Sequence, residues 1–271
     1  MADDTLSRFN PRSTYDIVAR DYDETSLDFW RYSVPETVRR LELRPGEGVL
    51  DVACGPGPAA LAAAAIVGPT GRVVGLDISA EMLARARQHA RETGVSNVDF
   101  MEGSLDDRPV HPGRFDAISC VFGMFFARDI AATLTSLAGS LAAGGRIAVT
   151  TLGQQFFSPL YERFVELAVC EVPGLETHVP WARTATLEQV TALFAEAGLE
   201  PRAELEVTRL PLRRPDDWWR IVMGTGIRRM ALELSTDQLA TVREGCQRWA
   251  ADRQVNAVDL GVIYTLAKAP G

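Results

Sequence analysis

The sequence has almost no lysine. Lys268 is the only one, and nearly all the positive charge is carried by arginine. Arginine stays protonated and cannot serve as an amine nucleophile. The scarcity of lysine therefore excludes Schiff-base chemistry and the lysine of a phosphate-binding loop.

Cysteine pairs, basic clusters and long apolar runs are also lacking. None of the four cysteines stands in a C-x-x-C pair, which predicts a reduced protein without a disulfide framework or a metal site. The longest apolar stretch, residues 59–67, is too short to span a bilayer, and the first residues lack the pattern of a signal peptide. We expect a cytoplasmic protein that is not inserted in a membrane.

The charge balance argues against a nucleic-acid partner. The net charge is −8, the sequence pI is about 5.0, and arginines gather only in doublets. Proteins that bind a nucleic-acid backbone usually present a basic face. We therefore expect a small-molecule partner and a monomer or homodimer.

Short apolar runs alternate with helical patterns between residues 48 and 152. Expected strands cover 49–53, 72–76, 98–101, 115–121 and 146–151, and expected helices cover 59–67, 80–93 and 130–141. This alternation predicts an α/β fold with a doubly wound parallel sheet. The rhythm then changes, with expected helices at 156–172, 187–197 and 215–253 and expected strands at 203–212 and 260–267.

Three segments follow from this pattern. Residues 1–40 form an expected N-terminal helical lid, and residues 41–153 form the core. Residues 154–271 complete the sheet and carry helical insertions that cap the site. We expect the three segments to form a single domain overall.

A glycine turn follows the first expected strand, in Val49-Leu-Asp-Val-Ala-Cys-Gly-Pro-Gly57. Ligands of open α/β sheets bind at the carboxyl ends of strands, where glycines admit a cofactor close to the backbone. Asp77 ends the next strand about twenty residues later, where a carboxylate can accept hydrogen bonds from ribose hydroxyls. Together these features indicate a cofactor that contains adenosine.

The glycine turn also fits the G-x-G-x-x-A form of a dinucleotide fingerprint, so an NAD(P)-dependent oxidoreductase stays open. Two residues favour another cofactor. Asp51 lies inside the strand before the turn, where a carboxylate suits an ammonium group better than a pyrophosphate. Pro58 removes a backbone N–H from the first turn of the next helix. A non-catalytic cofactor-binding subunit is a further alternative.

In the order of five motifs, the sequence resembles class I S-adenosylmethionine-dependent methyltransferases, particularly the ubiquinone/menaquinone-biosynthesis group. The motifs are Val49–Gly57, Y-D-x-x-A-x-x-Y-D at 15–23, E-G-S-L at 102–105, the segment 115–126 and the turn at 141–146. The resemblance covers residues 12–153 well. It implies a Rossmann-like sheet, mostly parallel with an antiparallel last strand, with helical lid insertions. It also implies S-adenosylmethionine as cofactor and S-adenosylhomocysteine as product.

The resemblance also implies which residues bind the cofactor. Asp51, Ala53 and Gly55 would hold its methionine end, and the Cys120 backbone would face the ammonium group. Asp77 would bind the ribose, and Tyr15 and Tyr22 would close over the site. Ile78 would pack on the adenine, and Ser104 and Leu105 would meet its edge. Met82 is a further expected cofactor-binding residue. Ser104 departs from the family, which usually has aspartate there.

The acceptor and the methylated atom are left open by the sequence. The group acts on quinones, sterols, amines and natural products, and we expect transfer to an O, N or C atom of an apolar or aromatic molecule. Candidate acceptor contacts are Phe125, Phe157, Trp181 and Trp218, although core packing explains any one of them equally well. His178 is a candidate general base, although an exposed loop histidine is the more ordinary interpretation.

Overall fold

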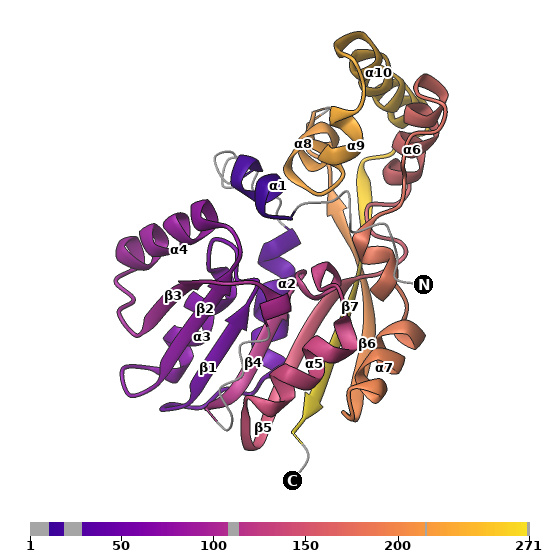
Figure 1. The fold of residues 1–271 in the computed structure, drawn as a ribbon. Helices are drawn as coiled ribbons and strands as arrows, with labels where there is room; N and C mark the ends of the chain where they lie inside the picture. Colours follow the sequence, from indigo (N-terminus) through magenta and orange to yellow (C-terminus); the bar gives the residue numbers. More distant parts are fainter. Residues whose placement is uncertain (1–10, 19–28, 108–113, 215, 270–271) are drawn as a thin grey trace.

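Seven strands form one sheet in the order β3-β2-β1-β4-β5-β7-β6 (Figure 1). The computed structural model describes residues 11–18, 29–107, 114–214 and 216–269. The strands are β1 (Gly48–Val52), β2 (Arg72–Asp77), β3 (Val98–Glu102), β4 (Phe115–Val121), β5 (Leu141–Leu152), β6 (Pro201–Pro211) and β7 (Ala257–Lys268).

Ten α-helices and three short 3₁₀ turns are found among the described residues. The α-helices are α1 (Pro11–Val18), α2 (Phe29–Arg40), α3 (Pro58–Val67), α4 (Ala80–Thr93), α5 (Ile130–Gly139), α6 (Leu160–Glu171), α7 (Leu187–Glu196), α8 (Asp217–Gly224), α9 (Arg228–Leu232) and α10 (Thr236–Asp252). The 3₁₀ turns are η2 (Leu105–Asp107), η3 (Met124–Phe126) and η4 (Pro180–Thr184).

Strand pairing confirms the predicted doubly wound sheet. β3, β2, β1, β4 and β5 pair in parallel, and β7 lies antiparallel between β5 and β6. The register places Asp51 of β1 opposite Gly75 of β2 and Ser119 of β4. This register brings the Ser119 hydroxyl beside the Asp51 carboxylate.

Apolar side chains of the parallel strands pack on both faces of the sheet. Val49 and Val73 belong to a buried cluster with the alanines of α3, whereas Leu50 and Val74 belong to a cluster with α5 and α7. Successive side chains of a strand point to opposite faces, so near-continuous apolar runs bury both faces. The helices thereby hold the strand ends in fixed positions.

A helical cap lies over the carboxyl edge of the sheet, on the side of β5 and β7 (Figure 1). α8, α9 and α10 are inserted between β6 and β7, and α6 packs against α10. The sequence predicted one helical stretch over 215–253, which the structure divides into these three helices. α1 lies on the same side of the molecule, above α2 and near α4.

Candidate active site

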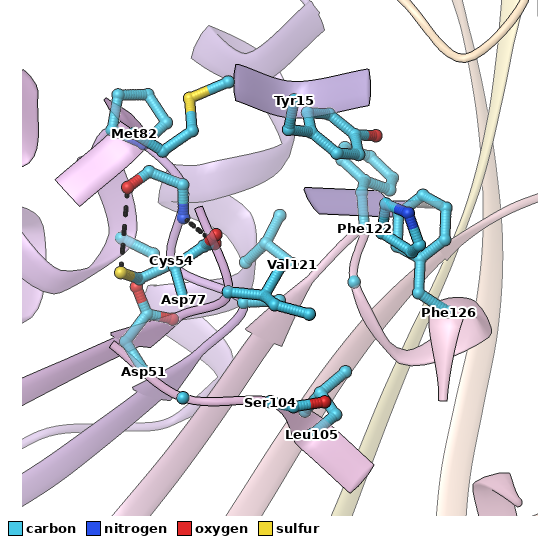
Figure 2. Close-up of a pocket in the computed structure, with 18 of the residues that line it drawn as sticks. Tyr15, Asp51, Cys54, Asp77, Met82, Ser104, Leu105, Val121, Phe122 and Phe126 are labelled. Atoms are coloured by element: carbon cyan, nitrogen blue, oxygen red, sulfur yellow. Dashed lines mark hydrogen bonds between the residues drawn. The ribbon is translucent and has the colours of Figure 1, made fainter. Parts of the chain in front are cut away.

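A cavity of about 240 Å³ opens at the carboxyl ends of β1, β2 and β4 (Figure 2). Cys120 is fully buried and does not line it; the next three residues, 121–123, do. Tyr22 lies outside the described residues. Nine of the predicted cofactor residues do line the cavity: Tyr15, Asp51, Ala53, Gly55, Asp77, Ile78, Met82, Ser104 and Leu105.

The turn after β1 has an unusual backbone that opens space for a ligand. Ala53, Gly55 and Gly57 have φ values of 53°, 54° and 87°, in the left-handed region that favours glycine. A Cβ on Gly123 would lie 2.4 Å from the Cβ of Ala53, so the loop after β4 needs glycine there. Small residues thus let two loops approach each other beside the cavity.

Asp51 is 1% exposed and has one unpaired carboxylate oxygen. Its Oδ1 accepts a hydrogen bond from Ser119 Oγ at 2.7 Å, whereas its Oδ2 has no partner among the residues that the structure describes. Burial raises the pKa of Asp51 to about 7, and the negative charge of Asp77 adds to the shift. A buried, unpaired carboxylate oxygen at a cavity wall fits the ammonium group of a bound amino acid.

Asp77 accepts hydrogen bonds from the backbone on both sides. Its Oδ2 accepts from the N–H of Gly55 at 2.8 Å and its Oδ1 from the N–H of Ser79 at 2.9 Å. Ser79 Oγ caps α4 by accepting from the N–H of Met82, so Asp77 is not needed as the side-chain cap. A carboxylate has about four acceptor sites, and two remain for a ribose.

α1 joins the cavity through three contacts. Asp16 accepts a hydrogen bond from Ser79 Oγ at 2.5 Å, and Arg12 pairs with Glu102 at the end of β3. The Tyr15 ring lies edge-on to Phe126, with ring centroids 5.6 Å apart. Burial raises the pKa of the Tyr15 phenol, and the charge of Asp77 adds to this shift. Tyr15 therefore stays protonated and can donate a hydrogen bond.

A second, smaller cavity of about 50 Å³ adjoins the first. Both cavities are lined by Tyr15, Phe122 and Phe126, which gather on one side of the site (Figure 2). The remaining wall of the second cavity is largely apolar and comes from β5, the segment before α6, η4 and the turn between α8 and α9. Of the predicted acceptor contacts, Phe125, Phe157 and Trp181 line it and Trp218 does not.

Residues 49–145 match a family described as methyltransferase domain. A demethylmenaquinone methyltransferase of Lactococcus lactis is 28% identical over 160 residues, which cover 56% of this chain and 62% of that protein. Nocamycin O-methyltransferase of Saccharothrix syringae is 33% identical over 136 residues, which cover 50% of this chain and 49% of that protein. These two matches thus span less than two thirds of each relative.

Residues 49–145 are a methyltransferase domain.

The similarity in fold extends over a longer stretch. The crystal structure of an S-adenosylmethionine-dependent methyltransferase from Aquifex aeolicus superposes with a TM-score of 0.57 at 13% identity, covering 97% of this chain and all of that one. The predicted family and the methyltransferase class are confirmed at the level of this domain. Nothing in these matches supports the NAD(P)-dependent oxidoreductase.

Several lining residues of the methyltransferase domain were not predicted from sequence. Asp106 and Arg128 line the first cavity together, although 22 residues separate them. Phe122 and Phe126 lie on the loop after β4 and form the partition between the two cavities. The motif at 115–126 pointed to this loop, but only the tertiary structure shows which of its aromatic residues face the site.

His178 lies outside both cavities. Its side chain is exposed, its N–H donates to Glu176 Oε1, and its carbonyl accepts from Arg229. Burial raises the pKa values of the Cys54 and Cys120 thiols, which keeps both thiols protonated. No group of three or more histidine, cysteine, aspartate or glutamate side chains suited to a metal ion occurs in the described ranges, and no helix there could cross a membrane.

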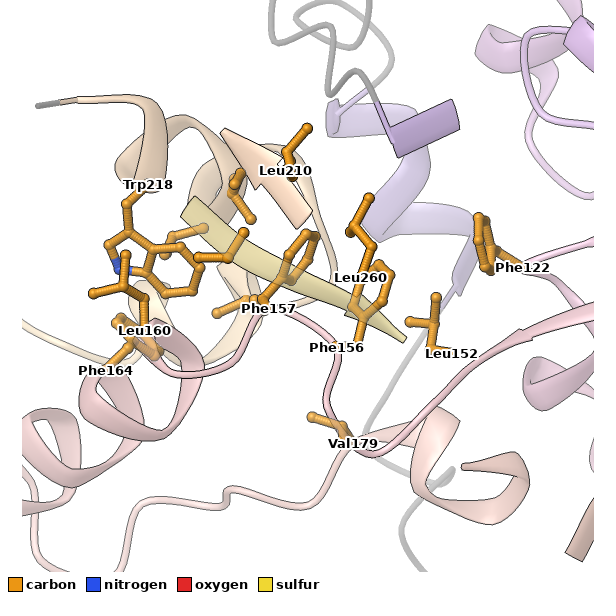
Figure 3. Close-up of a cluster of buried hydrophobic side chains, with 14 of the residues drawn as sticks. Phe122, Leu152, Phe156, Phe157, Leu160, Phe164, Val179, Leu210, Trp218 and Leu260 are labelled. Atoms are coloured by element: carbon orange, nitrogen blue, oxygen red, sulfur yellow. The ribbon is translucent and has the colours of Figure 1, made fainter. Parts of the chain in front are cut away.

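Trp218 belongs to the buried cluster that holds the cap to the sheet (Figure 3). It is 4% exposed, and its ring lies edge-on to Phe157 with centroids 6.2 Å apart. Phe157 separates it from the second cavity, which Phe157 lines directly. Trp218 therefore fills the core of the cap, one layer behind the cavity wall.

Replacing Trp218 with alanine is expected to lower the free energy of unfolding by about 3–5 kcal/mol, because it leaves a large hole in a packed core. Binding of S-adenosylhomocysteine by the folded variant is expected to stay within about twofold, since only a core contact is lost. Urea unfolding and calorimetry measure the two effects. The control is Trp249→Ala, since Trp249 is only partly buried and stacks with Arg253. Equal destabilisation by both substitutions would contradict the core assignment of Trp218.

Proposed function

We propose that the chain transfers the methyl group of S-adenosylmethionine to an O, N or C atom of a small apolar or aromatic molecule. The observation that carries this proposal is the adjacency of the two cavities. The first offers carboxylates to a cofactor, the second offers aromatic walls to an acceptor, and Tyr15, Phe122 and Phe126 line both. A methyl group held between these cavities faces an acceptor without crossing solvent.

The first cavity is proposed to bind the cofactor in one orientation. The unpaired Oδ2 of Asp51 accepts from the ammonium group, while Ala53 and Gly55 border the methionine chain. Asp77 uses its two free acceptor sites for the ribose hydroxyls. Ile78 and Met82 lie at the adenine, as do Ser104 and Leu105. Residues 121–123, which follow Cys120 in the chain, line the cavity, and their backbone faces the ammonium group.

The cofactor supplies an electrophilic sulfonium methyl group when it is bound. The protein then needs to align the acceptor and exclude water. Phe122 and Phe126 provide apolar walls at the junction, and the protonated Tyr15 can donate a hydrogen bond to an acceptor oxygen. A base is required only for acceptors that lose a proton, and His178 lies outside both cavities.

The relatives support a small-molecule acceptor. Their names specify demethylmenaquinone and nocamycin as the molecules they methylate, and both are small molecules. We extend this class of acceptor to the present chain and place its role in secondary metabolism in the cytoplasm. Because the net charge is −8, we expect no nucleic-acid partner. Residues 1–40 act as the lid, 41–153 as the cofactor-binding core and 154–271 as the remaining sheet and substrate cap, in a monomer or homodimer.

The test is to fill the second cavity while sparing the first. A Cβ on Gly226 would lie 2.9 Å from the Trp181 ring, and both residues line the second cavity, so Gly226→Val adds bulk to this wall and displaces the ring. With methyl-labelled S-adenosylmethionine and a panel of hydroxylated aromatic acceptors, the variant is expected to lose about tenfold or more of the transfer rate. Its affinity for S-adenosylhomocysteine is expected to stay within about twofold.

The matched control is Gly139→Val, because a Cβ on Gly139 meets no atom within 4 Å. Transfer by this variant is expected to equal that of the unmodified protein. Full transfer by Gly226→Val to every acceptor that the unmodified protein methylates would show that the second cavity does not hold the acceptor.

A further inference from the structure

The short turns η3 and η4 together form part of the wall of the second cavity. η3 contributes Phe125 and Phe126, and η4 contributes Trp181. The rings of Phe125 and Trp181 lie edge-on to each other with centroids 6.3 Å apart, and the centroids of Phe125 and Phe126 are 4.6 Å apart. The three rings thus follow one another along the wall, although the two turns are far apart in the sequence.

The end of η3 is tied to η4 by one arginine. η3 spans only three residues, so the carbonyl groups at its end have few partners within the turn. Arg183 of η4 donates to these carbonyl groups through its guanidinium group. Its Nη1 lies 2.8 Å from the carbonyl oxygen of Ala127 and 3.5 Å from that of Phe125. Its Nη2 lies 3.0 Å from the carbonyl oxygen of Arg128.

η4 is itself anchored to the sheet. Thr151 of β5 donates through its hydroxyl to the carbonyl oxygen of Thr184 at 3.1 Å, and both threonines are buried. The hydroxyl of Thr184 in turn donates to the carbonyl oxygen of Trp181 at 3.3 Å. Arg183 therefore extends from a turn that is fixed to the sheet, and its hydrogen bonds place η3 relative to that turn.

The chemistry of arginine suits this position better than that of lysine. A guanidinium group is planar and donates in fixed directions, so its two terminal nitrogens can meet the neighbouring carbonyl groups of Ala127 and Arg128. An ammonium group is a single point on a flexible stem. Arg183 is not among the residues that line the two cavities, so it acts on a ligand through the residues that it holds.

We propose that Arg183 is a positioning residue that sets the shape of the second cavity and, through it, the affinity for the acceptor. This inference rests on the proposed function, in which the second cavity holds the acceptor. Without Arg183, η3 is no longer tied to η4, and Phe125 and Trp181 cease to present one fixed surface. The first cavity keeps Asp51 and Asp77, whose hydrogen bonds do not involve η3 or η4.

The test measures methyl transfer from saturating S-adenosylmethionine to catechol, resorcinol and 2-naphthol. Arg183→Ala is expected to raise the KM for each acceptor that is methylated by about tenfold and to leave kcat within about threefold, since it weakens binding of the acceptor alone. Its affinity for S-adenosylhomocysteine is expected to stay within about twofold. Arg183→Lys keeps the charge and part of the hydrogen bonding, so we expect a rise in KM of only about threefold.

Chemical rescue distinguishes the guanidinium group from a general loss of structure. Guanidinium ions at millimolar concentration can occupy the position that Arg183→Ala leaves empty and donate to the same carbonyl groups. They are expected to lower the raised KM of this variant, whereas sodium ions at the same concentration are not. Arg183→Lys provides the same comparison of KM and cofactor affinity if Arg183→Ala does not fold.

The matched control is Arg146→Ala. Arg146 also donates to backbone carbonyl groups, including those of Leu41 and Glu42, but it lines neither cavity. Its loss is expected to lower the free energy of unfolding and to leave the KM for the acceptors unchanged. Hydrogen exchange of the ligand-free proteins gives a readout that needs no acceptor. The backbone amides of η3 and η4 are expected to exchange faster in Arg183→Ala than in Arg146→Ala.

An unchanged KM in folded Arg183→Ala would overturn the positioning role and leave the proposed function intact. An equal rise of KM in Arg146→Ala would do the same, as would a loss of cofactor affinity as large as the loss of acceptor affinity. If the unmodified protein binds S-adenosylhomocysteine but methylates none of the acceptors, the proposed function is overturned for hydroxylated aromatic molecules, and this inference with it.

Discussion

Replacing Asp77 with alanine is expected to weaken the binding of S-adenosylhomocysteine by about a hundredfold or more. Hydrogen bonds to a charged group contribute roughly 1.5–3 kcal/mol each, and the ribose offers two hydroxyls to this carboxylate. The substitution also removes the acceptor for the N–H groups of Gly55 and Ser79, which loosens the turn beside the cofactor. Isothermal titration calorimetry measures the affinity directly.

The control for Asp77 is Asp99→Ala. Asp99 is also a strand carboxylate, on β3, but its side chain is exposed and pairs with Arg72 on the surface. An exposed ion pair contributes little to stability, and Asp99 does not line the first cavity. Its removal is therefore expected to leave the affinity unchanged. Unchanged affinity in Asp77→Ala, with the variant folded by circular dichroism, would contradict the ribose role.

Asp51→Asn is expected to weaken S-adenosylhomocysteine binding by about two orders of magnitude or more at pH 8, because it removes the buried partner of the ammonium group. The pH dependence identifies the cause. Since the pKa of Asp51 is raised to about 7, ligand binding below that pH must first release the proton. The affinity of the unmodified protein is expected to fall about tenfold per pH unit below pH 7. The weaker affinity of Asp51→Asn is expected to be independent of pH in this range.

The stability of the ligand-free protein gives a second readout for Asp51. Its pKa in the folded state lies above the ordinary value of 3.8, so the folded protein keeps a proton that the unfolded chain has released between these two values. The free energy of unfolding therefore decreases as the pH rises from 3.8 to 7 and is independent of Asp51 above that. Lowering the pH from 7 to 5.5 is expected to stabilise the unmodified protein by about 2 kcal/mol relative to Asp51→Asn. A constant difference between the two proteins would show that Asp51 is ionised throughout.

The fold was predicted well where the sequence repeats a simple pattern. From β1 to β4, buried strands alternate with helices that glycines or capping residues delimit, and the expected ranges agree closely with the structure. The fifth strand was expected at 146–151, but β5 begins earlier, at Leu141. The prediction was less accurate after Gly153. A helix was expected from Phe156, but α6 begins at Leu160, because Pro159 disfavours a helical Ser158 and Phe157 has a φ of 67°.

The candidate site was predictable where it depends on local spacing. Asp51, Gly55 and Asp77 stand at fixed distances around a strand and a glycine turn, and the structure brings all three to one cavity. The second cavity could not be predicted, because α1, η3, η4 and the α8–α9 turn meet only through tertiary packing. The contact between Asp106 and Arg128 likewise depends on how two separate loops pack together.

The aromatic residues show the same distinction between local pattern and tertiary packing. Phe125, Phe157, Trp181 and Trp218 all carry large aromatic side chains, so the residue type does not separate a cavity wall from a core residue. Three of them line the second cavity, and Trp218 packs behind Phe157. They are distinguished by whether the side chain lines the cavity or packs behind its wall. This position depends on the arrangement of the cap.

The most direct test of the central claim is calorimetric titration of the unmodified protein with S-adenosylhomocysteine and, separately, with NADH. We expect S-adenosylhomocysteine to bind with a dissociation constant in the micromolar range and NADH to give no binding heat, because the unpaired oxygen of Asp51 suits an ammonium group and not a diphosphate. Binding of NADH without binding of S-adenosylhomocysteine would contradict the claim and would make the first cavity a nicotinamide site.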